Sequence, residues 1–350
     1  MKIGLVGLPS SGKSTVFNAL TGLSAETGVG ASRGKTNLGV VKVPDPRVEA
    51  LAGLFKPKKK TLAEITFSDV AAGLSSGGGQ ALARSVLDAM RESDALCQVV
   101  RAFCDPTQAS PPDPMREVTD LEMEMILADL ELVEKRIDRS KKEKASPREQ
   151  AGLKVLKDHL DADKPLRSLA MSEDDWSLFV SLRFLSLKPL LLVLNVDEGA
   201  VSQPPPPAVA AYAKERGLGL VVLSAKVEQD IAQMAPADQK EFISSLGLTE
   251  PAKDRFVRAA FALLDLISFL TFGDDECRAW PIRRGTIAHK AAGKVHSDIE
   301  RGFIRAEVIR VEDLLSLKTE GKCREAGKLR LEGKEYVVQD GDAVNFRFNV

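Results

Sequence analysis

Residues 7–14 read Gly-Leu-Pro-Ser-Ser-Gly-Lys-Ser and match the phosphate-binding pattern G-x-x-x-x-G-K-S/T at every fixed position. The apolar run Lys2–Val6 before this stretch predicts a buried strand, and residues 15–20 after it predict the start of a helix. A glycine-rich loop between a strand and a helix directs its backbone amides and the helix N-terminus at phosphate oxygens. The sequence therefore predicts a P-loop nucleotide-binding domain, with Lys13 reaching the β- and γ-phosphates.

The same loop supplies candidates for catalysis and for metal binding. Lys13 is the candidate catalytic residue, because its ammonium offsets charge on the reacting phosphates. The Ser14 hydroxyl can coordinate Mg²⁺, the expected cofactor, and Asp69 at the end of a predicted strand over residues 62–70 is the candidate carboxylate ligand. The loop residues expected to contact the nucleotide are Ser10, Ser11, Gly12, Lys13, Ser14 and Thr15.

Two later motifs occupy the places of the base-recognition loops of a GTPase. Asn195-Val196-Asp197-Glu198 follows the strand-like run 189–194, where a GTPase carries N-K-x-D. Ser224-Ala225-Lys226 follows the apolar run 218–223 and is similar to the S-A-K loop that closes over the base. The residues expected at the base are Asn195, Val196, Glu198, Ser224, Ala225 and Lys226.

The altered residues of the first motif favour adenine over guanine. Glu198 is one methylene longer than the aspartate that accepts the guanine N1 and N2 hydrogens, so its carboxylate overshoots that position. Val196 removes the lysine stem that covers the ring, whereas backbone groups can satisfy adenine without a carboxylate. ATP is therefore the expected substrate and should bind more tightly than GTP, unless a shifted loop presents Asp197 to guanine.

Apolar runs alternate with helical stretches over much of the chain, and residues 62–70, 95–103, 189–194 and 218–223 are strand-like. This is the pattern of a parallel sheet covered on both faces. From about residue 282 short strands alternate with glycine turns, as in a compact α+β module. The predicted class is α/β: a P-loop G domain with a mostly parallel sheet (1–112 and 185–262), an inserted α-helical hairpin (113–184) and a C-terminal α+β domain (263–350).

The hairpin is predicted from helical spacing. Apolar residues recur three and four apart between 118 and 137, and the charged run 139–144 interrupts them. Ser146-Pro147-Arg148-Glu149 then has the form of a capping box with proline at the first helical position. The apolar stripes form a core seam, and a protruding hairpin also offers a surface to a partner.

Composition restricts the classes of partner. The 350 residues carry a net charge of −1, so nucleic acid is not attracted to the molecule as a whole, and no stretch approaches the ~20 apolar residues of a membrane span. The three histidines lack the spacing of zinc ligands. A cytoplasmic location is expected. Reduced thiols and a redox-sensing thiol both remain open for the unpaired Cys97, Cys104, Cys277 and Cys323.

These motifs resemble the YchF/Obg-like ATPase family of TRAFAC-class P-loop G proteins. The resemblance includes the P-loop and the N-x-x-E motif at 195–198. Residues 39–47 are similar to the family's segment after switch I. Residues 129–131 and 182–189 are similar to its inserted coiled coil and to the segment that returns the chain to the G domain. The most extensive similarity is C-terminal, at 278–280, 291–309 and 325–350. There the chain resembles a TGS domain, a ubiquitin-like β-grasp module.

The resemblance implies a slow Mg²⁺-dependent ATPase whose nucleotide state controls binding to the ribosome or ribosomal RNA, with a role in translation or stress response. It also implies a cytoplasmic monomer without a membrane or DNA partner. None of the motifs supplies an obvious general base, so hydrolysis is expected to rest on positioning and electrostatics. A basic run over 318–334, with six basic and three acidic residues, fits either an RNA contact or a solvated helix face.

The chain departs from the family pattern in three places. Ser10 replaces an asparagine that assists monovalent-cation binding in related GTPases, which leaves K⁺ dependence open. Arg33 stands at the ungapped position of the switch I threonine, so Thr36 becomes the third candidate Mg²⁺ ligand through a local shift. Ala72 precedes Gly73 where D-x-x-G is usual. Two alternatives therefore stay open, a nucleotide-dependent binding module with little hydrolysis and a GTPase.

Overall fold

The computed structural model describes residues 1–23, 37–70, 82–106, 108, 110–143 and 145–349. It divides into two compact units that interleave along the chain. The first comprises Met1–Val40 and Thr66–Ala260, and the second comprises Val41–Ile65 and Phe261–Val350.

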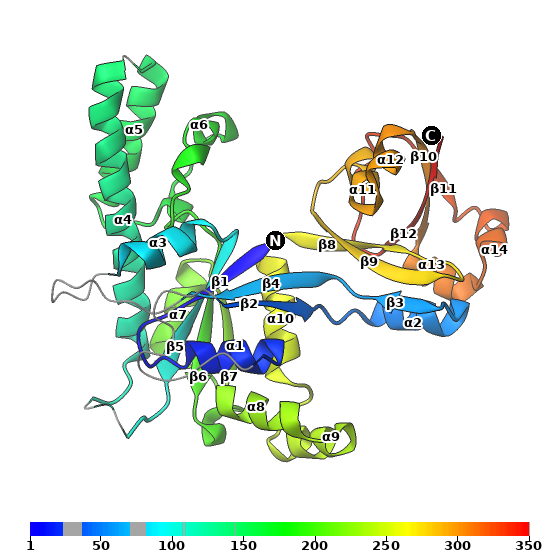
Figure 1. Cartoon of the computed structure of the whole chain (residues 1–350), viewed down its shortest axis with the longest axis horizontal. Coiled ribbons are helices and arrows are strands. Elements are labelled where there is room, and N and C mark those ends of the chain that lie inside the picture. Colours follow the sequence, from blue (N-terminus) through cyan, green and yellow to red (C-terminus); the bar gives the residue numbers. More distant parts are fainter. Residues whose placement is uncertain (24–36, 71–81, 107, 109, 144, 350) are drawn as a thin grey trace. The chain divides into compact units, whose positions relative to one another are not determined.

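The first unit is built on a six-stranded sheet in the order β2-β4-β1-β5-β6-β7 (Figure 1). The pairs β1–β4, β1–β5, β5–β6 and β6–β7 are parallel, which confirms the α/β class and the mostly parallel sheet. All four strand-like runs are confirmed, with ends shifted by up to two residues, whereas β2 was not predicted. The strands are β1 (Lys2–Val6), β2 (Asn37–Lys42), β4 (Glu64–Asp69), β5 (Ala95–Ala102), β6 (Leu190–Val196) and β7 (Gly219–Leu223).

Helices follow the strands and bury the sheet. Every residue of β6 is buried, as expected for a central strand that is covered on both faces. Phe256 packs on Phe67 of β4, with 5.4 Å between ring centroids. The helices of this unit outside the insertion are α1 (Lys13–Thr21), α3 (Arg84–Arg91), α7 (Pro207–Glu215), α8 (Ala225–Gln233), α9 (Pro236–Ser245) and α10 (Ala252–Leu263), with a short turn η3 (Glu198–Ala200).

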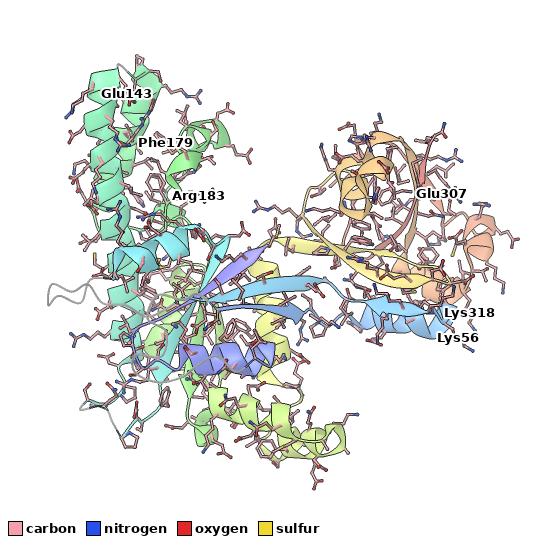
Figure 2. All side chains as sticks on the ribbon, in the orientation of Figure 1. Lys56, Glu143, Phe179, Arg183, Glu307 and Lys318 are labelled. Carbon is pink, nitrogen blue, oxygen red and sulfur yellow. The ribbon has the colours of Figure 1, made fainter. Side chains whose placement is uncertain are left out.

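The predicted helical hairpin is present as α4 (Pro114–Glu143) and α5 (Pro147–Leu160), and Glu143 lies at its tip (Figure 2). The Ser146 side chain accepts the Glu149 N–H at 3.2 Å, so the predicted cap is confirmed. Glu149 does not complete the box, because its carboxylate pairs with Arg136 across the hairpin at 2.6 Å. The seam between the helices holds buried leucines and a valine: Val133, Leu153, Leu156 and Leu160.

A buried carboxylate joins the base of the hairpin to the returning chain. Asp129 of α4 accepts the N–H groups of Leu185 and Ser186 at 2.9 and 2.7 Å, and the Ser186 hydroxyl at 2.7 Å. Burial raises the pKa of Asp129, and these three hydrogen bonds oppose that shift. The segment before β6 is thereby held on α4, and it contains η1 (Leu166–Ser168), α6 (Glu173–Ser177) and η2 (Val180–Leu182).

The second unit contains a mixed six-stranded sheet in the order β11-β10-β12-β8-β9-β3. This sheet, with five helices in the described residues, confirms the predicted α+β character. The strands are β3 (Lys59–Thr61), β8 (Leu266–Thr271), β9 (Glu276–Arg283), β10 (Phe303–Arg310), β11 (Arg330–Glu332) and β12 (Asp342–Phe348). The helices are α2 (Pro46–Phe55), α11 (Ala288–Val295), α12 (Ser297–Arg301), α13 (Val311–Leu317) and α14 (Glu320–Glu325).

The structure and the sequence-based domain boundaries assign residues 41–65 differently. The sequence-based boundaries place these residues in the nucleotide-binding domain. In the structure they belong to the second unit, because β3 pairs in parallel with β9. Arg47 in the first turn of α2 also binds Asp340 at 2.9 Å. A strand partner so far along the chain leaves no trace in the local pattern, so sequence reasoning missed it.

The helices and the cysteines bear on two expectations from the sequence, the lack of a membrane span and the state of the thiols. No helix within the described ranges is long and apolar enough to cross a membrane. Cys97, Cys277 and Cys323 are buried, whereas Cys104 is exposed. Burial raises the pKa of all three buried thiols, which disfavours their thiolate forms.

Replacement by alanine should have opposite effects on stability at two helical glycines, Gly152 and Gly53. A Cβ added at Gly152 of α5 would lie 2.8 Å from the ring of Phe179, which lies beside the hairpin (Figure 2), whereas one at Gly53 of α2 would meet nothing within 4 Å. Gly152→Ala should therefore lower the free energy of unfolding by about 1–3 kcal/mol, and Gly53→Ala should raise it by about 0.5–1 kcal/mol. Urea unfolding followed by circular dichroism measures both, and stabilisation by Gly152→Ala would contradict the packing of Phe179 on α5.

Candidate nucleotide site

The phosphate-binding loop connects β1 to α1 and is crowded at its glycines. Gly12 precedes the first residue of α1 and has φ of 85°, which favours glycine. A Cβ there would lie 2.2 Å from Nδ2 of Asn195, and a Cβ at Gly7 would lie 2.5 Å from the Val99 carbonyl oxygen. Glycine is thus required where other backbone and side chains approach the loop. The helix begins at Lys13, two residues before the expected start, so the loop leads directly into the helix N-terminus.

Lys13, Ser14 and Asp69 meet at one carboxylate. Lys13 Nζ lies 2.5 Å from Asp69 Oδ1, and the Ser14 hydroxyl donates to Asp69 Oδ2 at 2.9 Å. The side chains of Lys13 and Asp69 are 6% and 0% exposed, so the ion pair is screened little by water. The structure therefore brings together the predicted phosphate-binding lysine and two of the three predicted metal ligands.

The local chemistry fits a Mg²⁺-bound nucleoside triphosphate. Ser14 and Asp69 present the oxygen ligands that Mg²⁺ prefers, and Mg²⁺ commonly takes only one or two protein ligands beside phosphate oxygens and water. Ser11 Oγ is buried in the loop without a hydrogen-bond partner in the described residues, so the loop has unused polar capacity. The partial positive charge at the start of α1 adds to the attraction for phosphate.

Asn195 joins the phosphate-binding loop to the second predicted base loop. Its Nδ2 donates to the Ser11 carbonyl at 3.1 Å, and its Oδ1 accepts the Ala225 N–H at 2.9 Å. Both ends of the amide are therefore engaged with backbone groups, and the side chain is buried. The three predicted motifs meet at this residue, which holds the loops in place.

The other predicted base residues lie around this junction with different exposure. Val196 is only 8% exposed and packs in the core of the unit, whereas Glu198 and Lys226 are exposed to solvent. Ser224 is buried immediately before α8 and makes no side-chain cap. Their roles at a base stay predictions, and Val196 has little free surface with which to contact one.

Sequence reasoning missed a contribution from the loop after β5. The Cys104 N–H donates to Asp197 Oδ2 at 3.2 Å, and Gln108 Nε2 donates to Ser10 Oγ at 3.3 Å. Phe103 is also near the loop, 3.6 Å from a Cβ built on Gly12. The position of this loop at the carboxyl end of a parallel strand was the available signal, because ligands collect at that edge of such sheets.

Two further residues predicted to contact the nucleotide, Ser10 and Thr15, lie in the phosphate-binding loop and at the start of α1. Ser10 has φ of 64°, a left-handed conformation that is uncommon for serine, and Thr15 is half-buried in the first turn of α1. Thr36 and Arg33 lie outside the described residues, as do Ala72 and Gly73.

Two family descriptions match the chain. Residues 2–137 match the 50S ribosome-binding GTPase family (MMR_HSR1), and residues 266–349 match YchF-GTPase_C, described as a protein of unknown function (DUF933).

Full-length relatives are similar over nearly the whole chain. The ribosome-binding ATPase YchF of Bacillus subtilis (strain 168) is 41% identical, with 99% of each chain covered. The protein of the same name from Escherichia coli O157:H7 is 39% identical and covers 100% of this chain and 99% of its own. The solved structure of the Schizosaccharomyces pombe YchF GTPase is 30% identical, with a TM-score of 0.89 over 99% of this chain and 97% of its own.

Lys13 has two expected roles, to bind phosphate and to neutralise the buried Asp69, and its replacement tests both. Lys13→Ala should abolish binding and hydrolysis of Mg²⁺-ATP, and should also lower stability by about 3–5 kcal/mol because Asp69 is left buried without its cation. Lys13→Ala combined with Asp69→Asn should recover much of the stability and still fail to bind. Calorimetric titration, a turnover assay and urea unfolding measure these effects. Unchanged ATP affinity and turnover in Lys13→Ala would contradict the phosphate-site assignment.

Proposed function

The chain belongs to the YchF family, and we propose that it is a slow Mg²⁺-dependent ATPase that binds the ribosome under control of its nucleotide state. Hydrolysis by a P-loop domain agrees with the names of its full-length relatives. The observation that carries the proposal is the convergence of Lys13 and Ser14 on the buried carboxylate of Asp69. This arrangement offers a charge for phosphate and oxygen ligands for the metal at one point.

The chemistry follows from what these residues can hold. Ser14 and Asp69 would hold Mg²⁺, which when bound neutralises charge on the phosphates. Lys13 would bind phosphate oxygens, and the N–H groups at the start of α1 would orient them. Asn195 keeps the loop in shape through Ser11 and does not need to touch the substrate to contribute. Rate enhancement rests on this positioning and on fixed charge, without a side chain acting as general base.

ATP is preferred to GTP in this proposal. Asp197, the carboxylate that a shifted loop could have offered to guanine, is engaged with the Cys104 N–H at 3.2 Å. Glu198 begins η3 and is exposed, one methylene longer than the residue that reads guanine. With one oxygen of Asp197 engaged and Glu198 longer than the aspartate that reads guanine, we expect guanine to leave polar groups unmet, and each typically costs ~1–3 kcal/mol.

The ribosome is the proposed partner, through ribosomal RNA or protein at its surface. The hairpin α4–α5 and the C-terminal part of the second unit, which we take as a TGS-like domain over about 263–350, would supply the contacts. Lys322 and Arg324 on α14 are exposed and make no ion pair within the described residues. The protein would act as a cytoplasmic monomer, without a DNA or membrane partner and with a role in translation or stress response.

A GTPase is the second candidate, favoured by the description of the solved relative as a YchF GTPase. Competition between ATP and GTP separates the two candidates, because a GTPase would bind GTP at least as tightly as ATP. A single-turnover assay with and without ribosomes distinguishes either enzyme from a binding module that scarcely hydrolyses.

Competition binding should give at least a roughly tenfold preference for ATP over GTP. Glu198→Asp should narrow that ratio, because the shorter side chain restores the reach that guanine needs. Glu241→Asp, at another exposed position, on α9, is the matched control and should leave the ratio unchanged. Equal affinities in the unaltered protein, or tighter GTP, would overturn the assignment of ATP as substrate.

Ribosome co-sedimentation should fall with added salt, because the basic side chains that neutralise RNA phosphates release counterions. Charge reversal by Lys322→Glu with Arg324→Glu should weaken binding and reduce the salt slope by about one unit for each phosphate that is no longer neutralised. Reversal of the exposed Lys214 and Lys240 in the first unit is the matched control. Salt-independent binding, or equally weakened binding in both double variants, would exclude α14 as an RNA-binding element.

A further inference from the structure

A cleft of about 390 Å³ lies beside β7, and neither Lys13 nor Asp69 is among its described lining residues. We call it the β7 cleft; its lining comprises Leu220, Val221 and Val222 of the strand, part of the 201–205 loop, the turn Gly247–Leu248, and Arg255 of α10. The volume falls in the range of roughly 300–1,000 Å³ that is usual for ligand sites. The lining combines apolar groups from Val201, Pro205 and Leu248 with polar ones from Ser202 and Gln203, so the surface suits an amphipathic occupant.

One wall of the cleft is the free edge of the sheet. β7 is the last strand in the order of its sheet and, among the described residues, pairs with β6 alone. The Val222 carbonyl accepts Arg255 Nη2 at 3.4 Å, so the backbone groups of Val222 face away from β6. Because strand residues alternate, Leu220 presents its N–H and C=O in the same direction. Such an edge can accept the backbone of another extended segment.

Arg255 is only partly used by the protein itself. Its single hydrogen bond in the described residues is the long one to Val222, and its Nε is buried without any acceptor there. The buried carboxylate of Glu228 on α8 is not the hydrogen-bond partner of Arg255, because its two oxygens accept the Ala252 and Lys253 N–H groups at 2.9 and 3.1 Å. A guanidinium with spare donors in the lining of a cleft is suited to a carboxylate, which it can bind through two parallel hydrogen bonds.

We propose that the β7 cleft binds an extended segment of a partner protein, which adds to the free edge of β7 and places a carboxylate on Arg255. Strand addition supplies backbone hydrogen bonds, the apolar lining takes alternate side chains, and Arg255 selects for acidic ones. Nucleic acid fits less well, because Arg255 is the only basic residue in the described lining and phosphate backbones require several cations.

The site would communicate with the nucleotide site around Lys13. The 201–205 loop follows η3 and the Asn195 motif, and the carboxyl end of β7 leads directly into Ser224 and Ala225. A peptide seated in the cleft therefore contacts the segment that follows the first predicted base loop and the strand that precedes the second. Any effect of the peptide on ATP affinity must be reciprocal. This coupling rests on the proposed function, whereas peptide binding itself does not.

Three labelled pentapeptides with amidated C-termini test the proposal against the full chain by fluorescence polarisation. The first alternates valine and glutamate, the second has glutamine for glutamate, and the third has proline for the central valine. The glutamate peptide should bind roughly tenfold tighter than the glutamine one, because the neutral glutamine amide has a single acceptor oxygen and cannot form a bidentate ion pair with Arg255. The proline peptide should bind weakly, since it lacks an N–H for the strand edge. Hydrogen exchange at the Leu220 and Val222 amides should slow in the complex.

Variants of the protein locate the binding. Arg255→Lys keeps the charge but removes the planar fork, and should weaken the glutamate peptide roughly tenfold without affecting the glutamine peptide. Ser202→Trp, at an exposed position of the lining, should block all peptides and leaves Arg255 intact. Arg139→Gln, an exposed arginine on the hairpin, is the control.

Three results would overturn the proposal. They are equal affinity for the glutamate and glutamine peptides, no binding at about 1 mM peptide, and protection of the Leu220 and Val222 amides by an oligouridine instead. Peptide binding in Lys13→Ala separates this inference from the proposed function, because it should persist when nucleotide binding is abolished. Failure of that variant to bind peptide, with the fold retained, would mean that the cleft does not act independently of the nucleotide site.

Discussion

The ion pair between Lys13 and Asp69 is the contact on which the architecture of the site depends. Asp69 is fully buried, and a carboxylate in that environment is tolerated only when a cation and hydrogen bonds replace its water. Lys13 and Ser14 provide both, at 2.5 and 2.9 Å. The end of β4 is thereby held against the first turn of α1, so the residues expected to bind phosphate and metal are already close together.

Asn195 performs a comparable task with a neutral amide. Its donor and its acceptor are both engaged with backbone groups, at Ser11 and Ala225, so the phosphate loop and the two base loops form one connected structure. The lack of a Cβ at Gly12 is what permits this approach. Substitution of Asn195 would therefore affect nucleotide binding through loop position, even if the residue never touches the base.

The nucleotide loops and the β7 cleft are connected through β6 and β7. β6 leads into the Asn195 motif and from there into the 201–205 loop, which lines part of the cleft, whereas Leu220–Val222 of β7 line the cleft and the strand then leads to Ser224. A segment bound at the sheet edge and a nucleotide bound at the loops would thus act on the same short connections. Linkage of this kind requires that each occupant alters the affinity of the other by the same factor.

The amino-acid sequence alone was sufficient to predict the P-loop, the four strand-like runs, of which the first contains Asp69, and the capped hairpin, because each of these follows from local spacing and residue type. It was not sufficient for β3, whose partner β9 lies far along the chain, so residues 41–65 were assigned to the wrong compact unit. Nor could it place the loop after β5 beside Asp197. Pairing between distant segments depends on the packed fold, and only the tertiary structure brings those atoms within hydrogen-bonding distance.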